Sequence, residues 1–78
     1  MNKQRRKDID TIIQTLEEIR EQIQFVLEEK QEYLDNIPEN LQNSERYETA
    51  QTAVSELEEA DGSIDDIIEH LENAKDGT

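Results

Sequence analysis

Carboxylates at two places in the chain have the spacing of a magnesium site. Glu17, Glu18 and Glu21 form an EExxE sequence, and Glu58 and Asp61 form an ExxD sequence. Carboxylates of this kind hold Mg²⁺ in metal-dependent hydrolases, where they face the space between packed helices. Such chemistry would make the chain a metal-dependent all-α nucleotide hydrolase that works as an oligomer.

The position of these carboxylates on their helix argues against that chemistry. Glu17, Glu18 and Glu21 fall at heptad positions b, c and f, opposite the apolar residues of the same segment. Carboxylates on the polar side of an amphipathic helix usually form a solvated surface. We therefore expect no catalytic residue here, although the all-α nucleotide pyrophosphatases carry similar EExxE and ExxD elements.

Two further features are weak metal-site candidates. Asp61, Ser63, Asp65 and Glu72 match positions 1, 3, 5 and 12 of a calcium loop, but the loop lacks the glycine required at position 6. His70 is the only histidine, and a single imidazole among scattered carboxylates makes a poor transition-metal site. We expect no metal, no cofactor and no enzymatic activity.

Two amphipathic segments must position every one of these side chains. In the first, over about residues 3–35, isoleucine, leucine and valine recur every three or four residues, which is the period of a helix with one apolar stripe. The second covers about residues 44–74 and has the same period. The apolar residues expected to form the oligomer seam are Ile9, Ile12, Leu16, Ile19, Ile23, Val26, Leu57, Ile64, Ile68 and Leu71.

A turn at about residues 36–43 separates the two segments. Pro38 ends the first helix, and Ser44 can cap the second. Asp61-Gly62-Ser63 interrupts the second segment, but Leu57, Ile64 and Leu71 keep a spacing of seven, which favours a continuous or kinked helix. The sequence predicts one all-α domain over 1–78, an antiparallel coiled-coil-like hairpin that assembles into a four-helix bundle or dimer.

The charge of the chain limits its partners. It has 21 acidic and 8 basic residues and a net charge of −13, which disfavours direct binding of nucleic acid or of an anionic membrane. The absence of cysteine and of a long apolar run makes the cytoplasm the expected compartment. The candidate interaction residues are acidic: Glu56, Glu58, Glu59, Asp65, Asp66, Glu69 and Glu72.

The basic residues gather at the start of the chain, in a basic run over residues 3–7 that contains Lys3, Arg5, Arg6 and Lys7. An antiparallel hairpin brings this run towards the end of the second helix. We expect it to lie beside the last four of the candidate interaction residues, where it would offset their repulsion from the negative end of the helix dipole.

The segment around the turn resembles a known group of proteins. Residues 38–42, PENLQ, and residues 44–47, SERY, are similar to the central segment of short acidic proteins of Gram-positive bacteria and their phages and prophages. The group is largely uncharacterised, and the resemblance implies no catalytic motif. Members tend to carry an apolar residue and no glycine near Asp61 and Gly62, so this chain departs there.

Two classes of function are consistent with the sequence. The first is a non-enzymatic protein–protein interaction module, whose partner is a second copy of the chain or another protein with a basic surface. A sharper version is a phage-type inhibitor that presents carboxylates as a nucleic-acid mimic to a basic host protein. The alternatives are the oligomeric hydrolase described above and a purely structural coiled-coil oligomer.

Overall fold

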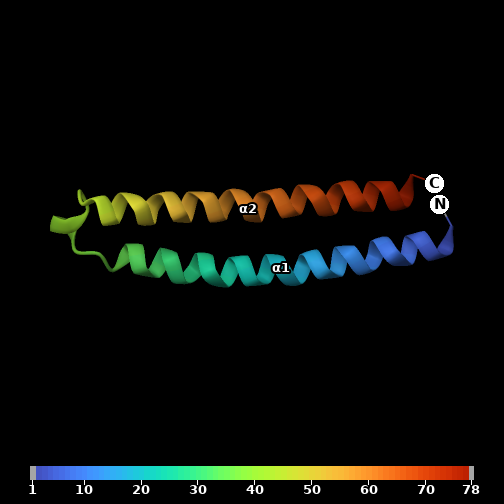
Figure 1. Ribbon diagram of the computed structural model, residues 1–78, viewed down its shortest axis with the longest axis horizontal. Coiled ribbons are helices and arrows are strands. Elements are labelled where there is room, and N and C mark those ends of the chain that lie inside the picture. Colours follow the sequence, from blue (N-terminus) through green and yellow to red (C-terminus); the bar gives the residue numbers. More distant parts are fainter. Residues whose placement is uncertain (1, 78) are drawn as a thin grey trace.

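The chain forms a long, thin hairpin of two helices (Figure 1). The computed structural model describes residues 2–77, which comprise α1 (Lys3–Asp35), a short 3-10 helix η1 (Glu39–Leu41) and α2 (Glu45–Asp76). The Cα atoms extend over 59 × 16 × 12 Å, and the two helices run antiparallel, so the start of α1 and the end of α2 lie at the same end of the hairpin. The predicted all-α hairpin is confirmed, with the first helix at the predicted bounds.

Side chains cap both helices at their N-terminal ends. The Asn2 side chain accepts a hydrogen bond from the Arg5 backbone N–H at 2.8 Å, and Ser44 Oγ accepts one from the Tyr47 N–H at 3.2 Å. Each bond satisfies a backbone donor that has no partner within its helix. Pro38 follows the end of α1 and immediately precedes η1. The predicted roles of Ser44 and Pro38 are therefore confirmed.

The second helix runs without a break through Gly62 and ends at Asp76, slightly beyond the predicted residue 74. Its apolar residues keep their helical spacing on both sides of Gly62, so burial of the stripe outweighs the low helix propensity of one glycine. The prediction of a continuous helix is confirmed. Because the segment from Asp61 to Glu72 is helical throughout, it cannot fold as a calcium loop.

Polar pairs between the helices define their register. Arg20 pairs with Asp65, Gln24 with Asp61 and Lys75 with Asp10, and in each pair the two residue numbers add up to 85. Two apolar clusters lie between the helices, one built on Ile13, Ile64 and Ile68 and the other on Leu34, Ala50 and Val54.

This register corrects the predicted position of the basic run. It places residues 3–7 opposite positions 78–82, past the end of α2 at Asp76. The run therefore does not lie beside Asp65, Asp66, Glu69 and Glu72. Asp65 instead pairs with Arg20, about halfway along α1. The prediction was wrong because the packing of the apolar clusters sets the register, and the charges do not.

The contact between the helices uses only part of the apolar surface of α1. With Ile9 taken as heptad position a, the residues of α1 in this contact lie at positions a and e: Ile9, Ile13, Leu16, Ile23, Leu27 and Leu34. The residues at heptad position d stay open to solvent: Ile12 is 47% exposed, Ile19 39% and Val26 43%. These three residues of the predicted oligomer seam lie outside the contact within the hairpin, because α1 carries three apolar rows and a single neighbouring helix covers only two.

Candidate protein interaction surfaces

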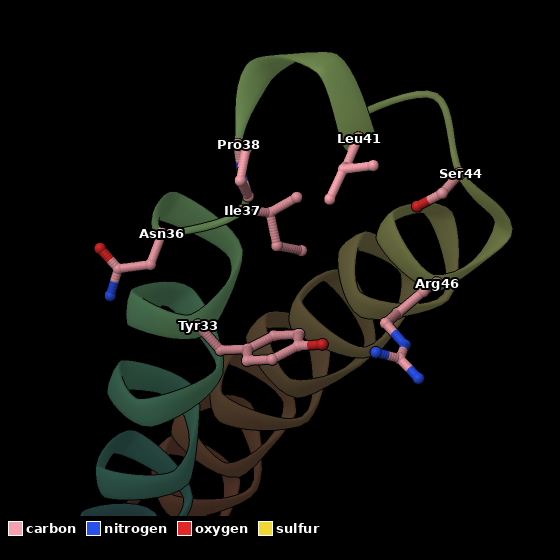
Figure 2. A pocket seen from close by; sticks show the side chains of 7 residues that line it. All are labelled: Tyr33, Asn36, Ile37, Pro38, Leu41, Ser44 and Arg46. Atoms are coloured by element: carbon pink, nitrogen blue, oxygen red, sulfur yellow. The ribbon is translucent and has the colours of Figure 1, made fainter.

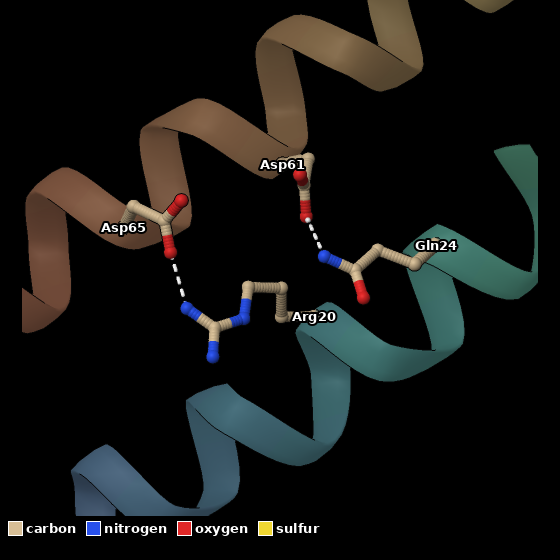
Figure 3. Close-up of polar contacts among 4 residues, drawn as sticks. All are labelled: Arg20, Gln24, Asp61 and Asp65. Atoms are coloured by element: carbon tan, nitrogen blue, oxygen red, sulfur yellow. Dashed lines mark hydrogen bonds and ion pairs between the residues drawn. The ribbon is translucent and has the colours of Figure 1, made fainter.

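One edge of the hairpin is held by polar side chains, and we call it the polar edge (Figure 3). Arg20 Nη1 donates to Asp65 Oδ1, and Gln24 Nε2 donates to Asp61 Oδ1 at 3.3 Å. The hydrogen bond and the charge of Asp65, together with the nearby carboxylates of Glu17 and Asp61, raise the pKa of Arg20. The guanidinium therefore stays charged across the physiological range.

Arg20 bears directly on the metal-site candidates of the sequence. Glu17, Asp61 and Asp65 belong to the candidate magnesium and calcium sites, and their negative charges act on the Arg20 guanidinium. Glu18 and Glu21 instead line an open hollow beside Phe25. Within residues 2–77, no group of three His, Cys, Asp or Glu side chains is arranged to hold a metal ion.

The candidate acidic residues of α2 are all exposed, and most of them lie on one side. By helical spacing, all except Glu56 lie on one side of α2. This side begins at Asp65 on the polar edge and continues to the surface of α2 that faces away from α1. Glu56 shares a column with Thr49, Ser63 and His70 on the other side. We use the name acidic surface for these residues: Glu58, Glu59, Asp65, Asp66, Glu69 and Glu72.

The opposite edge of the hairpin carries apolar side chains, and we call it the apolar face. It consists of two rows of residues spaced by seven, one on α1 that begins at Ile12 and one on α2 that begins at Ala53. Its residues are Ile12, Ile19, Val26 and Tyr33 on α1, and Ala53, Ala60, Ile67 and Ala74 on α2. The two rows lie on the same side, since Tyr33 and Ala53 line one hollow, which the charged side chains of Lys30, Glu45 and Arg46 also line. Ile67 is 45% exposed, so the apolar face is open along its length.

A hollow of about 470 Å³ extends this side of the molecule to the turn (Figure 2). Figure 2 shows the Tyr33 ring and the Ile37 and Leu41 side chains around it, with Arg46 at its margin. Ile37 packs against the cluster of Leu34, whereas Leu41 is 51% exposed. The apolar face therefore continues onto the turn.

Neither the polar contacts of Arg20 and Gln24 nor the apolar face was predicted from the sequence. The contacts of Arg20 and Gln24 depend on the register, which no local motif reveals. The apolar face did leave a signal in the sequence, because Ile12 and Ile13 are adjacent and so cannot both face one neighbouring helix.

No helix within residues 2–77 is long and apolar enough to cross a membrane. Comparisons with protein-family models, with curated proteins and with solved structures found no match to this chain.

Proposed function

We propose that the chain is a non-enzymatic protein–protein interaction module that binds a basic partner protein through the acidic surface of α2. The observation that carries this proposal is the separation of charge from apolar area. The exposed carboxylates of α2 lie mostly on one side, and apolar side chains line the opposite edge.

The spacing of the carboxylates suits a partner that normally binds nucleic acid. From Glu58 to Glu72 the helix rises by about 21 Å, so its six residues place one carboxylate about every 4 Å along the axis. A DNA strand carries one phosphate every 3.4 Å or so. The acidic surface can thus act as a nucleic-acid mimic, and release of counterions from the basic groove would drive binding.

The setting of the proposal is the cytoplasm of a Gram-positive bacterium, where the chain would act as a phage-type inhibitor. The similarity of the PENLQ and SERY segments to short acidic phage and prophage proteins suggests this setting. The net charge of −13 points to the class of partner, namely basic host proteins that bind nucleic acid.

The position of Arg20 favours this proposal over a metal-dependent hydrolase. The guanidinium carries a positive charge beside Glu17, Asp61 and Asp65, where a hydrolase would need a divalent cation. The carboxylates of the EExxE sequence also lie away from the interior of the hairpin, since Glu18 and Glu21 line a hollow on the outside of α1.

The test is affinity capture from a Gram-positive cell lysate, followed by binding measurements with the purified captured protein. One variant replaces five carboxylates of the acidic surface by their amides: Glu58→Gln, Glu59→Gln, Asp66→Asn, Glu69→Gln and Glu72→Gln. The matched control makes the same change in net charge elsewhere: Glu21→Gln, Glu28→Gln, Glu29→Gln, Glu32→Gln and Glu39→Gln. Asp65 is left unchanged because it pairs with Arg20.

We expect the wild type and the control to bind a basic protein that duplex DNA displaces, and the first variant to bind it at least about a hundredfold more weakly. Affinity should fall steeply with salt concentration. Equal binding by the two variants would refute the role of the acidic surface. Magnesium-dependent hydrolysis of nucleoside triphosphates that is lost in Glu21→Gln would establish the hydrolase instead.

A further inference from the structure

We infer that the apolar face binds a second copy of this chain, giving a four-helix dimer in which the two turns lie at opposite ends. The inference concerns a different surface from the acidic one and does not depend on its role. Four observations support it: the thin core of the hairpin, the area of the apolar face, the side chains that two such faces bring together, and the distribution of charge.

The core of a single hairpin is thin. Among the described residues six apolar side chains are buried, from Val54 at 6% exposed to Leu34 and Ile64 at 9%, and none is fully enclosed. Two helices form only one layer, whereas stable domains pack at least two layers of elements around a core. A second hairpin on the apolar face would supply that layer and cover Ile12, Ile19, Val26 and Ile67.

The area of the apolar face is sufficient for a specific dimer. From Ile12 to Tyr33 the helix rises by about 32 Å, and the hairpin is 16 Å wide across its Cα atoms. These dimensions give about 500 Å² on each copy, or about 1,000 Å² in total, which is the lower bound for a specific interface.

Two apolar faces fit together well when the turns lie at opposite ends. A two-fold axis across the middle of the face then places Tyr33 beside Ile12 of the second copy, and Val26 beside its Ile19. On α2, Ala60 lies beside Ile67 and Ala53 beside Ala74. In these pairs apolar side chains meet apolar side chains, and residue i contacts j while j contacts i, as a two-fold interface requires.

The charged residues along the margins of the apolar face favour the same orientation. With the turns at opposite ends, Glu56 faces His70 of the second copy, and Glu29 faces its Thr15. With the turns at the same end, Glu29 would face Glu56 at the same level, and like charges across an interface are unfavourable. The first orientation avoids this repulsion.

Two measurements on the full chain test the dimer and its orientation. Light scattering across a range of concentrations should give about twice the chain mass of 9.1 kDa. Because the chain has no cysteine, Asn40→Cys in η1 provides a single site for a spin label. The two labels should lie about 50 Å apart, estimated from the helical rise between residue 40 and the two-fold axis. Labels within about 25 Å would overturn the orientation.

An adjacent pair of substitutions tests the face itself. Val26→Glu places a carboxylate on the apolar face, whereas Phe25→Glu places the same group on the outer side of α1, where Phe25 is 64% exposed. We expect Val26→Glu to raise the dimer dissociation constant at least about a hundredfold and Phe25→Glu to change it less than about threefold, because only the first buries an unpaired charge.

A monomeric mass of the wild type, or equal effects of the two substitutions, would refute the inference. If Val26→Glu fails to fold, the mass and label distance of the folded protein still decide the question. The variant in which five carboxylates of the acidic surface are replaced by amides should dimerise as the wild type does. The dimer and the acidic interaction can therefore fail independently.

Discussion

The glycine in the middle of α2 offers a sharp test of the fold, because replacing it should make the protein more stable. Gly62 is exposed, has no positive φ, and a Cβ atom built on it would meet no heavy atom within 4 Å, apart from the local helix backbone. Its conformation is therefore one that alanine also adopts. Alanine in a helix interior is more favourable than glycine by about 1 kcal/mol, mainly because the unfolded chain has fewer conformations to lose.

Gly62→Ala should thus raise the free energy of unfolding by about 1 kcal/mol, which corresponds to about 4–8 °C in melting temperature for a domain of this size. Gly77→Ala is the matched control. Gly77 follows the end of α2, and its added Cβ would lie 3.1 Å from the Asn73 carbonyl oxygen, so we expect no gain. The assay is thermal and urea unfolding followed by circular dichroism, with all proteins at one concentration so that self-association does not shift the comparison.

A loss of stability in Gly62→Ala would refute the reasoning. It would mean that the helix bends at Gly62, or that another part of the protein approaches its backbone closely. An equal gain in Gly77→Ala would also contradict the reasoning, because Gly77 lies past the end of α2 and its added Cβ would crowd the Asn73 carbonyl oxygen.

Three other predictions follow from the packing, the caps and the ion pairs. Ile68→Ala should lower the free energy of unfolding by about 2–4 kcal/mol and Phe25→Ala by less than about 1 kcal/mol in urea titrations, since Ile68 is buried and Phe25 is exposed. Ser44→Ala should cost about 1 kcal/mol in the same titrations by removing the cap of α2, and an unchanged midpoint would contradict that role. The hydrogen bond to Asp10 raises the pKa of Lys75 above its usual value, with the charge of Asp10 next in effect. The pair therefore contributes stability below the usual pKa of lysine and loses it as the pH rises through the raised pKa, and NMR titration should find that Asp10→Asn returns the pKa towards its usual value.

Much of the fold could be predicted from local signals. Apolar residues recur every three or four positions, Pro38 ends the first helix, and Ser44 caps the second. Each of these signals acts within a few residues, so together they identify the helices and the turn. The continuity of α2 through Gly62 was also predictable, because the apolar stripe keeps its phase there. These features depend on the chain near each residue and not on how the helices meet.

The register and the choice of contact column could not be predicted in this way. The heptad pattern allows Ile12 or Ile13 to face the neighbouring helix, and the choice depends on how α2 packs against the whole length of α1. The position of the basic run depends on the same packing. The expected pairing of that run relied on charges alone, and surface charges in water contribute too little to shift a register set by apolar burial.

The constant register also determines the order in which the hairpin can form. The contacts near the turn close short stretches of chain, whereas Gln24 and Asp61 are 37 residues apart and Asp10 and Lys75 are 65 apart. Between these two pairs the entropy cost of closing the loop rises by about 0.5 kcal/mol. Folding should therefore begin at the turn and proceed towards the open end, as a zipper closes. On the ribosome, α1 is synthesised first and must wait for α2, with its apolar stripe exposed until the turn emerges and the closing can start.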